Sequence, residues 1–266
     1  MTPELEEIVR DAYRIFGDYE IRHLLKVCHC PVYMTEEVKR ELLKTPLREI
    51  SSALLAEYTN SAHGWDDGTV AREMRYFLPR YMDLIAANDP PSDTGLGACL
   101  GRLGQAQWRE KWSGAEVDIL DRFFDRFALA SLKRANLEQT RSGLWQLAFD
   151  FKEVLSLVVT AGGDLDRILA TWNAAQDPAA TIYMASLRYD IADKGRGPYL
   201  CDSYLEHYHI EASYRIGAFL MDLDVDERIE IALFVGTDEI MQKFLSDVLY
   251  IKLNLHPLSF RRLYRW

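Results

Sequence analysis

The sequence lacks the features that mark a secreted or membrane-bound protein. Its longest apolar run, Val154 to Ala161, falls far short of the roughly 18–20 residues that a membrane-spanning helix needs. The first residues, Met1 to Glu7, have neither the basic nor the apolar region of a signal peptide. The cysteines have no disulfide-like spacing: Cys28, Cys30, Cys99 and Cys201. We therefore expect no membrane partner and a reducing, cytoplasmic location.

Basic residues are fewer than acidic ones. The chain has 31 lysines and arginines against 41 acids, a formal net charge of −10 and an isoelectric point of about 5.2. Because such a surface repels phosphates, we expect no nucleic-acid partner. The C-terminal end is the local exception, and we interpret its four bases as part of a solvated tail: Lys252, Arg261, Arg262 and Arg265.

Established catalytic motifs are also missing. The chain contains no Gly-x-Ser-x-Gly, no P-loop and no His-Glu-x-x-His sequence. The glycines of 95–97 and 101–104 lack the preceding strand that a dinucleotide fingerprint requires. A scattered catalytic triad would leave no local motif, but no pattern here supports one. We expect no catalytic residues, no cofactor and no enzymatic activity.

Two patterns suggest a metal site. Cys28-His29-Cys30 groups three possible ligands, but zinc sites usually space their cysteines by two residues and need a second ligand pair. A half-buried turn before Pro31 is the favoured interpretation. The second pattern is Glu-x-x-His, which occurs twice: Glu20 with His23, and Glu206 with His209. Two such motifs build a di-iron site in a four-helix bundle when two further glutamates join them, and no clear candidates for those glutamates stand out. The alternative is a surface carboxylate beside a histidine.

A third pattern, the acidic segment from Asp222 to Asp226, is similar to the start of a calcium-binding loop. An EF-hand has glycine at its sixth position and glutamate at its twelfth, where this chain has Glu227 and Leu233. We interpret the segment as the start of a helix that Asp224 or Asp226 caps.

Helical periodicity is what the sequence offers in place of these motifs. Apolar residues recur at spacings of three and four, and strand-like alternation is scarce. The pattern predicts an all-α fold of about eleven helices, arranged as an irregular, HEAT-like α-solenoid or a globular helical bundle. We expect residues 1–266 to form a single domain, with a possible subdivision near 88–97. The helices expected in the segments discussed below cover 69–87, 96–112, 141–160, 178–192, 199–223, 226–235 and 238–253.

The helix expected at 69–87 carries a proline at its centre. Pro79 removes a backbone hydrogen bond, so we expect the helix to kink there or to begin anew. Its apolar residues fall on one face, which predicts a core helix: Met74, Phe77, Leu78, Tyr81, Met82 and Ile85. A recognition surface is the alternative.

This region also carries a family resemblance. Ser61-Ala-His-Gly64, Arg75-Tyr-Phe-Leu-Pro-Arg-Tyr81 and Asp83-Leu-Ile-Ala86 resemble an uncharacterised family of bacterial all-helical proteins. Pro46-Leu-Arg-Glu-Ile50 and Gly101-Arg-Leu-Gly104 are similar too, so the resemblance covers about residues 28–130. It implies a bacterial, intracellular, helical protein, and it carries no catalytic residues across.

Most of the net charge lies in one stretch. Residues 202–239 contain ten acids and two arginines, a net charge of −8. A solvated acidic face would explain this, and so would a surface complementary to a basic partner. The candidate partner-binding residues are Asp202, Glu206, Glu211, Asp222, Asp224, Asp226, Glu227 and Glu230. Tyrosines lie among these acids, at 199, 204, 208 and 214, and such side chains suit an interface or a core.

These observations favour a protein-binding module. Its most concrete form is an immunity protein that neutralises a bacterial toxin by direct binding, with a basic toxin domain as the partner. The alternatives are a metal-dependent helical enzyme that uses the Glu-x-x-His pairs, and a non-catalytic scaffold.

Overall fold

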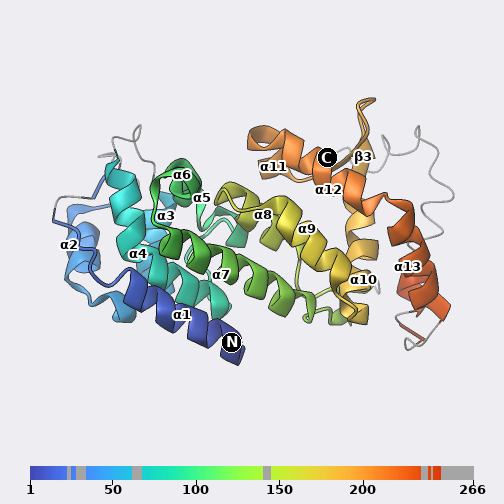
Figure 1. The fold of residues 1–266 in the computed structure, drawn as a ribbon, viewed down its shortest axis with the longest axis horizontal. Helices are drawn as coiled ribbons and strands as arrows, with labels where there is room; N and C mark the ends of the chain where they lie inside the picture. Colours follow the sequence, from blue (N-terminus) through green and yellow to red (C-terminus); the bar gives the residue numbers. More distant parts are fainter. Residues whose placement is uncertain are drawn as a thin grey trace. The chain divides into compact units, whose positions relative to one another are not determined.

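A computed structural model describes residues 1–22, 25–27, 34–61, 68–139, 145–234, 239–240 and 242–246 (Figure 1). The described residues are mostly helical, which confirms the predicted fold class. The chain divides into two compact units. Unit 1 comprises Met1–Ala128 and Glu153–Ile168, and unit 2 comprises Leu129–Lys152 and Leu169–Trp266. The single-domain organisation stays a prediction.

Helices are the regular secondary structure of unit 1 among its described residues, and loops join them. It contains α1 (Pro3–Ile15), α2 (Glu36–Lys44), η1 (Leu47–Glu49), α3 (Ser52–Asn60), α4 (Thr69–Ala86), η2 (Leu96–Ala98), α5 (Gly101–Gln105), α6 (Trp108–Lys111), most of α7 (Gly114–Leu132), most of α8 (Lys152–Thr160) and the start of α9 (Leu165–Ala174). Side-chain caps fix where several of these helices begin, since Thr2, Thr35 and Ser51 each accept a backbone N–H of the first turn.

Helix α4 packs against α1, α5 and η1 within unit 1. All six apolar residues of its predicted core face are buried, which confirms that prediction. The helix continues through Pro79 and does not begin anew there. The neighbouring prediction for 96–112 is wrong, because the segment forms three short helices, η2, α5 and α6, in place of one. Gln107 has a φ of 49°, in the left-handed region, and so separates α5 from α6.

Unit 2 combines helices with two small hairpins. Strands β1 (Leu137–Gln139) and β2 (Trp145–Leu147) pair antiparallel, as do β3 (Ile191–Asp193) and β4 (Pro198–Leu200). The helices that lie entirely within unit 2 are α10 (Pro178–Leu187), η3 (Arg188–Asp190), α11 (Ser203–Tyr208), α12 (Ile210–Leu220) and α13 (Leu223–Phe234). α12 packs against β4, and α10 packs against α13.

The hairpins correct three predicted helices. The helix expected at 141–160 begins only at Lys152, because residues 145–147 form β2. The Lys152 backbone N–H donates a hydrogen bond to the Asp150 side chain at 2.9 Å, at the start of this helix. The helix expected at 178–192 ends at Leu187 because η3 and β3 follow it. The segment 199–223 starts as β4 and then breaks at His209, where φ is −142°. The helix expected at 238–253 is described only at 239–240 and 242–246.

Candidate functional site

Half of the eight predicted partner-binding acids have a structural task inside unit 2. Asp202 caps α11 by accepting the backbone N–H groups of Tyr204 and Leu205, at 3.0 and 2.8 Å. Asp222 caps α13 by accepting the Asp224 N–H at 3.0 Å, so the cap is neither of the two residues expected to provide it. Such caps satisfy backbone donors at helix starts and are not free for a partner.

Two further acids are held in ion pairs. The Glu206 carboxylate accepts a hydrogen bond from Lys194 Nζ at 2.8 Å. Asp226 lies 2.5 Å from Nη1 of the buried Arg188, whose Nε donates to the Leu220 carbonyl oxygen at 2.7 Å. Arg188 thereby ties the first turns of α13 to the end of α12. These pairings compensate both charges within unit 2.

The remaining four acids are exposed: Glu211, Asp224, Glu227 and Glu230. Within the part of the chain that the structure describes, none of these side chains has a hydrogen bond or ion pair. Three of them lie on α13 and one on α12. The predicted acids that remain exposed and unpaired within the described residues therefore lie on α12 and, mostly, on α13.

Helix α13 also exposes large apolar side chains, which the sequence patterns did not predict. Leu223 and Phe234 are each 80% exposed, and Ile231 is 53% exposed. With 3.6 residues per turn, these three positions fall on the same side of the helix as Glu227 and Glu230. We call this surface the α13 face: Leu223, Asp224, Glu227, Glu230, Ile231 and Phe234. The spacing of these residues along the sequence does place them on one side of a helix. Leu223 and Phe234 are apolar, however, and from the sequence alone such residues are expected in the core.

The opposite side of α13 packs against the rest of unit 2. Val225 and Ile229 are buried. Arg228 Nε donates to the Thr181 hydroxyl oxygen and its Nη1 to the Asn173 carbonyl oxygen, both at 2.8 Å. The Ala175 carbonyl oxygen accepts from Nη2 as well, so Arg228 caps the C-terminal end of α9. The arginine of α13 is thus directed into the protein, and the exposed side keeps its negative charge.

The metal-site patterns do not have the geometry that they need in the described residues. Glu20 lies outside any helix and pairs with Arg22 at 2.9 Å, and its expected partner His23 lies outside the described residues. Glu206 and His209 do not share a continuous helix, because α11 ends at Tyr208. No group of three histidine, cysteine or carboxylate side chains suited to a metal lies within the described residues. Cys28-His29-Cys30 lies outside them.

The two described thiols are in settings that oppose thiolate chemistry. Cys99 is buried, and burial together with the nearby Glu153 carboxylate raises the pKa of its thiol to about 12. Burial also raises the pKa of Cys201, which is only half-buried. A reactive cysteine needs a lowered pKa, so neither residue has the environment of a nucleophile.

Unit 1 contains a buried cluster of polar side chains. Glu73 is fully buried, and its two carboxylate oxygens accept hydrogen bonds from the Tyr58 hydroxyl and the Lys26 backbone N–H, both at 2.7 Å. Arg102 Nη2 donates to the Tyr58 and Ser61 carbonyl oxygens at 2.6 Å. Its guanidinium carbon lies 4.1 Å from the centre of the Tyr58 ring. Because these bonds join α3, α4 and α5, we interpret the cluster as part of the scaffold.

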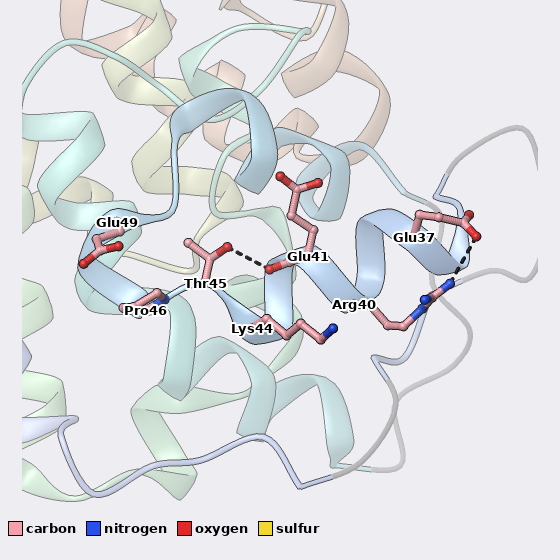
Figure 2. A pocket seen from close by; sticks show the side chains of 7 residues that line it. All are labelled: Glu37, Arg40, Glu41, Lys44, Thr45, Pro46 and Glu49. Atoms are coloured by element: carbon pink, nitrogen blue, oxygen red, sulfur yellow. Dashed lines mark hydrogen bonds and ion pairs between the residues drawn. The ribbon is translucent and has the colours of Figure 1, made fainter.

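The surface of unit 1 has an open hollow of about 520 Å³ beside α2 (Figure 2). Its lining mixes both charges, and Arg40 Nη2 donates to the Glu37 carboxylate at 3.1 Å. The Thr45 hydroxyl donates to the Glu41 carbonyl oxygen at 2.8 Å, which closes the end of α2. The lining of the hollow therefore carries both signs of charge and no large apolar side chain. The α13 face, in contrast, combines negative charge with large apolar side chains.

Comparison with known proteins adds no further assignment: no family model, curated protein or solved structure matches this chain. Among the described residues, every helix is too short or too polar to cross a lipid bilayer.

Proposed function

We propose that this chain is a protein-binding module that holds a basic protein partner against the α13 face. Its most concrete form is a cytoplasmic immunity protein that neutralises a bacterial toxin by direct binding. One observation carries the proposal: carboxylates that have no partner among the described residues surround large apolar side chains on an exposed helix face, and buried contacts on the other side hold that helix in place. The apolar side chains supply the buried centre of an interface, and the carboxylates steer and select a basic partner.

The charge distribution within unit 2 supports the same proposal. Arg188 and Arg228 are directed inward, where they bind carbonyl oxygens and Asp226. Of the predicted acids, those that are exposed and unpaired in the described part of the chain include three on α13: Asp224, Glu227 and Glu230. A toxin domain that acts on nucleic acid or nucleotides carries a basic surface, which these acids would complement.

The partner is first identified by site-specific crosslinking in cells that produce the chain. A photo-reactive amino acid replaces Glu227 in one variant and Glu57, an exposed residue of α3, in another. We expect a basic protein to be crosslinked from position 227 and not from position 57. Co-expression then tests the immunity form, because the wild-type chain should restore growth in cells that express the crosslinked partner.

Charge reversal on α13 should slow association with that purified partner. The variant D224K/E227K/E230K turns three attractive charges into repulsive ones, so we expect the association rate constant to fall by roughly tenfold or more at low salt. The matched control is E41K/E49K/E57K, which reverses three exposed acids of unit 1 and changes the net charge equally. Stopped-flow fluorescence measures both. Equal slowing by the two variants, or no slowing by the first, would contradict the proposal.

A further inference from the structure

A second exposed feature of unit 2 is a cluster of aromatic rings at α11. Tyr204 is 39% exposed and Tyr208 is 63% exposed, and their ring centres lie 4.8 Å apart. The His207 ring stands edge-on to Tyr208 with centres 4.4 Å apart, and the His209 ring stacks on Tyr204 at 6.3 Å. α11 buries only Leu205, so these rings are not required as core.

Acidic residues precede, interrupt and follow the helix that carries these rings, although Lys194 already compensates one of them, Glu206. Asp202 and Glu206 lie on or next to α11, and Glu211 follows in the first turn of α12, exposed and without a partner within the described residues. Burial lowers the pKa of His209 below its usual value, which favours the uncharged imidazole beside Tyr204. A cation that approaches the cluster therefore meets aromatic faces and carboxylates together.

The neighbouring hairpin already shows what this combination binds. Lys194 Nζ lies 4.5 Å from the centre of the Tyr199 ring and donates to the Glu206 carboxylate at 2.8 Å. A tyrosine face and a carboxylate thus hold a cation within unit 2 itself. Tyr204 and Tyr208 present the same chemistry at the surface, where no cation of the described residues lies over either ring.

We propose that the exposed rings of Tyr204 and Tyr208 receive an arginine side chain of a basic protein segment, with Glu211, in the first turn of the following helix, as the countercharge. This inference rests on the proposed function, since it names a side chain through which the partner is recognised. Arginine fits better than lysine because its planar guanidinium stacks on a ring and is more weakly hydrated than an ammonium. The α13 face attracts both kinds of cation, whereas the α11 rings discriminate between them.

The test compares fluorescein-labelled hexa-arginine and hexa-lysine peptides, whose binding to the full chain is measured by fluorescence anisotropy at low salt. We expect wild type to bind hexa-arginine roughly three- to tenfold more tightly, the range that cation–π contacts supply. Y204L/Y208L removes the ring faces but keeps apolar bulk, and it should abolish this preference by weakening hexa-arginine more than hexa-lysine. Y204F/Y208F keeps the rings and should retain the preference.

The α13 variant D224K/E227K/E230K separates this inference from the proposed function. It should weaken both peptides by a similar factor and leave the arginine preference intact. If it weakens neither while Y204L/Y208L still removes the preference, the α13 proposal fails and the α11 site stands. The α11 proposal is overturned if hexa-arginine does not bind, if wild type shows no preference, or if Y204L/Y208L weakens both peptides equally.

Discussion

Replacing Glu73 with alanine should lower the free energy of unfolding of unit 1 by about 2–5 kcal/mol, because each buried donor left without an acceptor costs about 1–3 kcal/mol. Among the described residues, the donors are the Tyr58 hydroxyl, whose oxygen is buried with the ring, and the Lys26 backbone N–H. Burial raises the pKa of Tyr58 well above its usual value, so this hydroxyl stays protonated and cannot adapt by ionising. The substitution also leaves a cavity between α3 and α4.

Native-state hydrogen exchange measures this effect where it occurs. In Glu73→Ala, the amides of α3 and α4 should exchange faster, while those of α12 and α13 in unit 2 keep their wild-type rates. Glu57→Ala removes an exposed glutamate from α3 and should change the unfolding free energy by no more than about 0.5 kcal/mol. Similar effects of the two substitutions would show that the buried cluster does not hold unit 1 together.

Replacing Gly217 with alanine should lower the stability of unit 2 by about 3 kcal/mol, the upper end of the usual range for overpacking. A Cβ at this position would lie 2.5 Å from the Pro198 carbonyl oxygen and 2.6 Å from Tyr199 Cα. Both are backbone atoms, so no side-chain rotation relieves the contact. α12 would have to move away from β4, although alanine favours the helix by about 1 kcal/mol relative to glycine.

The control for Gly217→Ala is Gly114→Ala at the first residue of α7. A Cβ there would meet no atom within 4 Å, so we expect a stability change within about 1 kcal/mol. Urea unfolding, followed by the exchange of α12 and β4 amides, compares the two variants. If Gly217→Ala is as stable as wild type, the close packing of α12 on β4 is not what supports this part of unit 2.

Periodicity made the long helices predictable, but it did not reveal the short strands. The buried face of α4 follows from apolar residues three and four apart, and Pro79 did not end that helix because surrounding contacts bury the residue. Strands of three residues, such as Ile191–Asp193, are too short to show alternation. Between residues 96 and 112 the apolar spacing was correct, but Gln107 adopts a left-handed conformation that divides the helix.

The negative charge of the candidate site could be predicted from the sequence, but the particular residues that form its exposed surface could not. The excess of acids after residue 202 is visible in the sequence, but which of them are free depends on partners far along the chain. Glu206 is neutralised by Lys194, and Asp226 by Arg188. Likewise, Leu223 and Val225 are both branched apolar residues, so their composition does not distinguish them. Which side of α13 packs against the rest of unit 2 decides that Leu223 is exposed and Val225 is buried.

The most direct test of the α13 face is the salt dependence of the association rate constant with the crosslinked partner. Exposed charges are screened beyond a Debye length of about 10 Å at 0.1 M salt, so an attraction carried by Asp224, Glu227 and Glu230 must fade as salt is added. We predict a steep fall in rate constant for wild type and for E41K/E49K/E57K, and a flat or rising dependence for D224K/E227K/E230K. Equal slopes for all three proteins would contradict binding through the α13 face.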